Sequence, residues 1–153
     1  MKKSIIALIA VAALSSSFTV AAKDHWNMAY QQGVMEFHAV NKPTGAAITF
    51  SCKAPVEKFD PIVFNIFIDY KGKTYSGITD DGNYPVVTFE GQKYVIDDSN
   101  AGMSNWRGLF ESLRDTDAKT VSFQVEGKTP VFTLPVDSLK ALAIELKDDE
   151  CFK

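Results

Sequence analysis

The chain has 153 residues, 46% of them hydrophobic, and a formal net charge of −3. This length fits one domain of ordinary size with one hydrophobic core. The acidic balance argues against nucleic acid as a partner, because phosphate binding draws on clustered lysines and arginines.

The N-terminus has the pattern of a cleavable secretion signal. A basic start precedes an uninterrupted apolar run from Ile5 to Leu14, and small residues suited to a signal peptidase end at Ala22. The apolar run is about half of the roughly twenty residues that cross a bilayer. We therefore expect residues 1–22 to be removed during export, which leaves the chain in the periplasm or secreted, without stable membrane insertion afterwards. An uncleaved N-terminal tether stays open as the alternative.

We expect the remaining residues, 23–153, to form a single globular domain. This domain contains both cysteines of the chain, Cys52 and Cys151. Export delivers these thiols to an oxidising compartment, where two distant cysteines most often form a structural disulfide. A redox-active pair would more often be written as Cys-x-x-Cys. The sequence therefore predicts a disulfide that closes a loop of about a hundred residues.

Alternating apolar and polar residues predict a mainly antiparallel, sandwich-like β structure. The clearest hairpin turns at Lys71 and Gly72, and Cys52 ends a strand on its buried face. The expected strands cover residues 26–30, 34–40, 48–52, 62–68, 74–76, 86–89, 94–96, 121–125 and 131–134.

Two amphipathic helices are expected in the C-terminal half, which makes the fold class α+β. Ser104 is the predicted cap of the first helix, whose apolar stripe consists of Trp106, Leu109, Phe110 and Leu113. Pro135 and Asp137 introduce the second helix, which carries Leu139, Leu142, Ala143 and Leu146 on one side. Because Cys151 follows directly, the disulfide should hold this helix against the strand that contains Cys52.

No catalytic set is predicted. The segment from Gly102 to Trp106 lacks the last glycine of a nucleophile elbow. No phosphate-binding glycine loop occurs, so no cofactor is expected. The acidic run at Asp80 lacks the later glutamate of a calcium loop, and no metal site is predicted. A small hydrolase that uses His25 or His38 stays open as an alternative.

Binding is the predicted activity, and its candidate residues are aromatic and acidic side chains beside turns. Tyrosine is enriched at interface hot spots because it buries a large area at small entropic cost. We expect a protein partner, and the acidic balance favours a cationic one, although the same charge also serves solubility alone. Whether Tyr84 binds or belongs to the core stays open. The candidates are Tyr70, Tyr75, Asp80, Asp81, Tyr84, Asp97 and Asp98.

The order of these features resembles small periplasmic accessory proteins associated with type VI secretion and, less closely, the invasion-associated locus B family. The resemblance consists of the signal peptide, an early Trp26, the strand that ends in Cys52, the strand through Phe67 to Tyr70, and the strand and helix of 130–146 ahead of Cys151. It implies a periplasmic accessory protein and carries over only the two cysteines.

Three functions follow as hypotheses. The first is a non-enzymatic periplasmic binding protein, specifically an immunity or inhibitor protein against a cell-wall-degrading toxin or lysozyme-like enzyme. The second is an accessory protein of a secretion or surface-assembly system, and the third is the small hydrolase.

Overall fold

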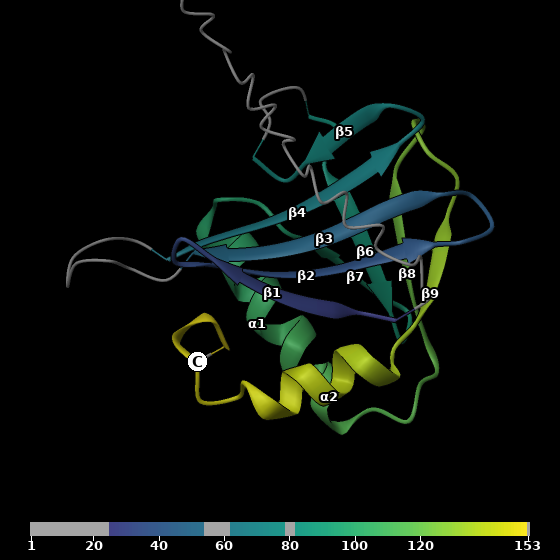
Figure 1. The fold of residues 1–153 in the computed structure, drawn as a ribbon. Helices are drawn as coiled ribbons and strands as arrows, with labels where there is room; N and C mark the ends of the chain where they lie inside the picture. Colours follow the sequence, from purple (N-terminus) through teal and green to yellow (C-terminus); the bar gives the residue numbers. More distant parts are fainter. Residues whose placement is uncertain (1–24, 54–61, 79–81, 153) are drawn as a thin grey trace, which may run out of the picture.

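The computed structural model describes residues 25–53, 62–78 and 82–152. Two antiparallel sheets and two helices make up these residues, so the fold class is α+β, as the sequence predicts (Figure 1). The predicted signal peptide, Asp80 and Asp81 lie outside the described residues.

The N-terminal half forms a five-stranded meander in which every strand pairs with its neighbour in sequence. Side chains alternate between the two faces of a strand, so the apolar residues of the central strands are buried on one face. The strands are β1 (Asn27–Gln31), β2 (Val34–Asn41), β3 (Ala46–Lys53), β4 (Val63–Tyr70) and β5 (Lys73–Ser76).

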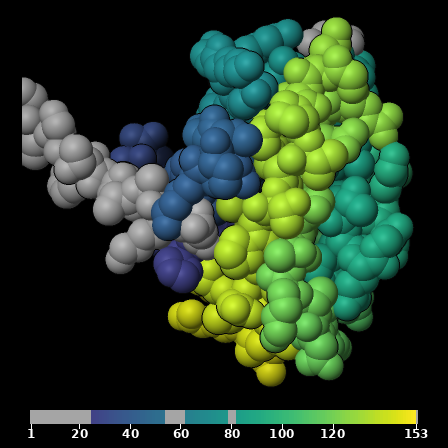
Figure 2. Space-filling view, turned by 90° about the vertical axis from the view of Figure 1, so that its right-hand side faces the viewer, coloured from purple at the N-terminus to yellow at the C-terminus, as the bar shows by residue number. Residues whose placement is uncertain are grey.

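The second sheet has four strands in the order β7-β6-β8-β9. Its strands are β6 (Pro85–Phe89), β7 (Gln92–Val95), β8 (Thr120–Val125) and β9 (Phe132–Pro135). In Figure 2, the yellow-green surface of β8 and β9 lies between the blue end of the β2–β3 hairpin and the teal-green strands β6 and β7. The amide of Asn41, at the end of β2, donates to the carbonyl of Thr133 in β9 at 2.9 Å and links the two sheets.

Both helices lie on the buried side of the five-stranded sheet (Figure 1). They are α1 (Asn100–Asp115) and α2 (Asp137–Glu145), and a short 3₁₀ turn, η1 (Glu150–Phe152), follows. The predicted stripe of α1 is fully buried, and Trp106 belongs to the core. Its ring stacks on Phe64 with centroids 4.9 Å apart, so this helix joins the first sheet to the core.

The disulfide between Cys52 and Cys151 is confirmed, with 6.1 Å between the two Cα atoms. It joins β3 to η1, which follows α2. Two hydrogen bonds from α1 hold the same region, because the Trp106 indole donates to the Cys151 carbonyl and Arg114 donates to the Phe152 carbonyl. The C-terminal segment is therefore fastened to both the sheet and the first helix.

The predicted cap of the first helix is wrong. The helix begins at Asn100, and its N-cap is Ser99, whose side chain accepts a hydrogen bond from the amide of Gly102. Ser104 lies inside the helix, exposed, and donates to the carbonyl of Asn100. Several polar residues precede the apolar stripe, and only the backbone geometry selects the one whose oxygen reaches the free amides.

This difference predicts unequal effects of two serine substitutions. Ser99→Ala should lower the free energy of unfolding by about 1 kcal/mol, because it leaves a helix-terminal amide without its acceptor. Ser104→Ala is the matched control and should change it by less than about 0.5 kcal/mol. Urea titrations of the two variants measure the contrast. Equal losses would contradict the assignment of Ser99 as the cap.

Candidate functional site

The structure describes five of the predicted binding residues and places them at three separate locations: the β4–β5 turn, Tyr84, and Asp97 with Asp98 before α1. Tyr70 and Tyr75 flank the β4–β5 turn, and neither lines the two pockets described below. The half-buried ring of Tyr70 packs on Phe132 with centroids 5.1 Å apart, and Tyr75 is buried. The ammonium groups of Lys71 and Lys73 lie over the two rings, at 5.2 and 4.8 Å from their centroids. Both tyrosine rings therefore take part in packing within the chain, and Tyr70 keeps part of its surface exposed.

Asp97 is hydrogen-bonded to the residue that caps α1. Its carboxylate accepts hydrogen bonds from the backbone amide and the hydroxyl of Ser99, the N-cap of α1. A Cβ atom at Gly102 would lie 2.2 Å from the same carboxylate, so this position requires glycine. Asp97 thus holds Ser99, the N-cap residue, in position at the start of α1.

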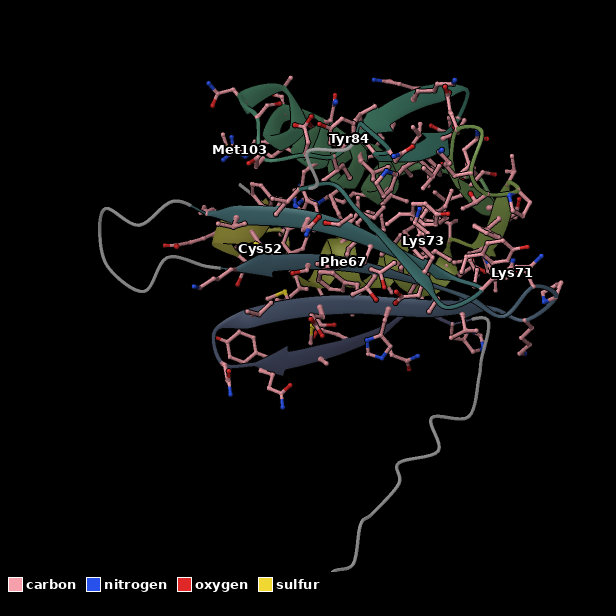
Figure 3. The ribbon with its side chains drawn as sticks, turned by 90° about the horizontal axis from the view of Figure 1, so that it is seen from above. Cys52, Phe67, Lys71, Lys73, Tyr84 and Met103 are labelled. Carbon is pink, nitrogen blue, oxygen red and sulfur yellow. A yellow bond between two sulfur atoms is a disulfide. The ribbon has the colours of Figure 1, made fainter. Side chains whose placement is uncertain are left out.

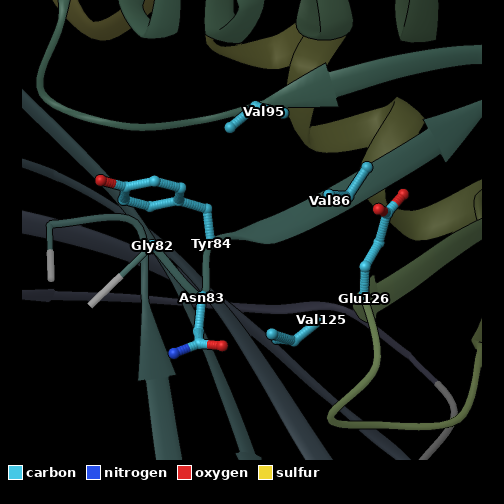
Figure 4. A pocket seen from close by; sticks show the side chains of 7 residues that line it. All are labelled: Gly82, Asn83, Tyr84, Val86, Val95, Val125 and Glu126. Carbon is cyan, nitrogen blue, oxygen red and sulfur yellow. The ribbon is translucent and has the colours of Figure 1, made fainter. Parts of the chain in front are cut away.

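Tyr84 lines a small pocket on the second sheet, which we call the Tyr84 pocket (Figure 4). Its volume is about 140 Å³. Glu126 stands on the side of Val86 opposite Tyr84 and accepts a hydrogen bond from Lys93 at 2.7 Å. This hydrogen bond and the lysine charge lower the pKa of Glu126. The lining residues are Gly82, Asn83, Tyr84, Val86, Val95, Val125 and Glu126.

A larger pocket, which we call the Met103 pocket, lies where the start of β4 meets the start of α1. Its volume is about 310 Å³, and its lining is mainly apolar. Among the lining residues that the structure describes, Asp98 is exposed and supplies the only carboxylate. The lining residues are Ile62, Val63, Phe64, Ile78, Asp98 and Met103.

Close backbone contact builds this pocket from distant parts of the chain. A Cβ atom at Gly77, just after β5, would lie 2.0 Å from the carbonyl oxygen of Ile96, just after β7. Glycine therefore lets the two segments touch, which brings Ile78 near Asp98. Figure 3 shows Met103 toward one end of the five-stranded sheet, whereas Lys71 lies toward the other end.

The dimensions and chemistry of the two pockets differ. Sites for small ligands usually span about 300–1,000 Å³ and are mostly apolar with a few polar groups. The Met103 pocket reaches the lower end of that range, whereas the Tyr84 pocket is smaller. Ile78 and Val63 are 40% and 37% exposed, so the Met103 pocket presents apolar surface to solvent. It can accept one apolar side chain of a partner, with a cationic group beside Asp98.

Asp98 is one of the predicted binding residues, whereas the apolar residues around it are not. Ile62 and Phe64 belong to the strand expected over residues 62–68, and Met103 directly precedes the predicted cap Ser104, so no pattern marks them as pocket residues. The one available signal was Ile78, an isolated apolar residue between a strand and a polar loop.

In the three described ranges, no group of three histidine, cysteine, aspartate or glutamate side chains could hold a metal ion. Among the helices of those ranges, none is long and apolar enough to cross a membrane.

A family model described as YfjT matches residues 24–143, which is most of the chain. No curated protein and no solved structure matches the chain significantly.

Proposed function

The chain belongs to the YfjT family, and we propose that it is an exported binding protein that captures a basic protein partner in the periplasm. The observation that carries this proposal is the Met103 pocket, an exposed apolar pocket of about 310 Å³ beside the Asp98 carboxylate. Interface hot spots form where one side chain fills a well-packed pocket and excludes water.

Charge favours a basic partner. The chain carries a net charge of −3, and removal of a signal that contains Lys2 and Lys3 makes it more acidic. Complementary charge raises the association rate of two proteins. Asp98, at the rim of the Met103 pocket, would then attract an arginine or lysine next to the inserted apolar side chain.

The buried disulfide supports export, because disulfides persist in oxidising compartments such as the periplasm. Within that compartment, a cell-wall-degrading toxin or lysozyme-like enzyme is the partner that we propose. The chain would act as its immunity or inhibitor protein by binding at the enzyme surface, without chemistry of its own.

Affinity capture from envelope extract tests this function. The chain is first recovered from the periplasmic fraction, where its mass should correspond to a start near Lys23. We expect the immobilised chain to retain a basic protein at moderate salt and to inhibit it if it is a hydrolase. Retention of a secretion or surface-assembly component instead would replace the inhibitor proposal with the accessory function. Recovery of the chain from the cytoplasm with residues 1–22 still attached would contradict export.

A further inference from the structure

One edge of the five-stranded sheet differs from the other sheet edges. The edge strands are β1, β5, β7 and β9. Charged residues and proline protect sheet edges against pairing with other strands. Lys73 lies in β5, Lys93 in β7 and Pro135 in β9, whereas β1 reads Asn-Met-Ala-Tyr-Gln and contains neither charge nor proline. Among the edge strands that the structure describes, β1 therefore lacks these protective residues.

The β1–β2 hairpin determines which backbone groups of β1 are free. Its loop is Gln32-Gly33, with φ angles of 52° and 79°, as in a two-residue type I′ turn. Such a turn makes Gln31 and Val34 a hydrogen-bonded pair. Because hydrogen-bonded and non-hydrogen-bonded pairs alternate along an antiparallel ladder, Met28 and Tyr30 belong to non-hydrogen-bonded pairs with β2. The N–H and C=O groups of Met28 and Tyr30 consequently point away from β2.

The same two residues expose their side chains. Met28 is 44% exposed and Tyr30 is 67% exposed, although both face the buried side of the sheet. Figure 3 shows β1 as the outermost strand of this sheet. The start of β1 is held in place, because the Trp26 amide donates to Ser138 and the Trp26 indole donates to the Pro135 carbonyl. The edge is thus fixed in position, and its outward backbone groups, which pair with no described strand, lie next to apolar side chains.

We propose that β1 pairs antiparallel with β1 of a second copy of this chain, about a two-fold axis at Ala29. In that register, Met28 lies opposite Tyr30 of the second copy, and Asn27 lies opposite Gln31. The free backbone groups of Met28 and Tyr30 then bond to each other across the interface. The two sheets become one continuous ten-stranded sheet.

The strand's own sequence favours a second copy over an unrelated strand. A two-fold interface must be complementary to itself, and β1 is nearly symmetric about its small central Ala29. Polar residues oppose polar ones, and the methionine sulfur contacts the tyrosine ring, which is a favourable pair. No like charges meet across the axis, because β1 carries no charge.

Cross-linking tests the proposed register in the full exported chain. Ala29 would lie opposite itself in a non-hydrogen-bonded pair, with Cα atoms about 4.5 Å apart, a distance that a disulfide spans. Ala29→Cys should therefore form a covalent dimer on mild oxidation. The matched control is Gln31→Cys, whose two copies would lie about 13 Å apart along the strands and should not cross-link. Equal cross-linking of both variants, or of neither, would overturn the register.

A charge substitution tests whether β1 is the interface. Light scattering after size exclusion should show a dimer that dissociates on dilution, and Tyr30→Lys should make it monomeric. Gln92→Lys adds the same charge to the edge strand β7 and should leave the dimer intact. A chain that is monomeric at all concentrations, or a dimer equally weakened by both substitutions, would overturn the proposal. Partner capture through the Met103 pocket is measured separately, and monomeric Tyr30→Lys should retain it.

Discussion

Replacing Cys52 and Cys151 together by alanine should lower the free energy of unfolding by about 2–5 kcal/mol. The bond joins residues 99 positions apart, so its loss frees most of the domain in the unfolded state. Both cysteines are buried, and alanine leaves no buried polar group at either position. For a domain of this size, the melting temperature should fall by roughly 7–18 °C.

Calorimetry of the variant and of the reduced wild-type chain provides the measurement. The two should melt at similar temperatures, both below the oxidised protein. Mass spectrometry establishes that both thiols are free in the reduced sample. An unchanged melting temperature with free thiols would contradict the structural role of the disulfide.

Trp106→Ala should destabilise the fold by about 3–5 kcal/mol, the range for truncation of a buried aromatic residue. The Trp106 side chain is fully buried, with ring centroids 4.8 Å from Phe110 and 4.9 Å from Phe64. Its indole also donates to the Cys151 carbonyl at 2.8 Å. Removal of the ring therefore opens a cavity at the centre of the aromatic core and deprives a buried carbonyl of its donor.

Two further variants separate these contributions in urea unfolding. Trp106→Phe retains an aromatic ring but removes the donor to the Cys151 carbonyl. Loss of that hydrogen bond alone should lower the free energy of unfolding by about 1–3 kcal/mol. Arg107→Ala, at the exposed neighbouring position, should change stability by less than about 0.5 kcal/mol. A loss below about 1 kcal/mol for Trp106→Ala would contradict the central position of this ring.

The disulfide and Trp106 should also be coupled. Both hold the segment at Cys151, one from β3 and the other from α1. Once the disulfide is absent, that segment is held less firmly, and Trp106→Ala should cost less than it does in the oxidised chain. A double-mutant cycle measures this difference.

Features with a local pattern could be predicted from sequence. The alternation of Ile48, Phe50 and Cys52 identified β3 and its buried face, because a strand repeats every two residues. The spacing from Trp106 to Leu113 identified the buried stripe of α1, because a helix repeats every 3.6 residues. The cap of α1 was missed, since cap geometry depends on where the backbone leaves the preceding loop.

Features assembled from distant segments could not be predicted. The Met103 pocket combines the start of β4, Ile78, Asp98 and the start of α1, and their proximity depends on the contact between Gly77 and Ile96. Likewise, Met28 and Tyr30 alternate like residues of an ordinary strand. Only the strand order shows that β1 is an edge, where the same side chains remain exposed.

Partner capture with pocket variants tests the proposed binding function most directly. Met103→Glu places a charge in the apolar pocket, whereas Ser104→Glu adds the same charge at an exposed neighbouring position of the helix. Both carboxylates lie near the N-terminus of α1, so both variants should remain folded, which calorimetry checks. We predict that the wild type and Ser104→Glu retain the same basic envelope protein and that Met103→Glu loses it. Equal retention by all three chains, or by none, would contradict binding through this pocket.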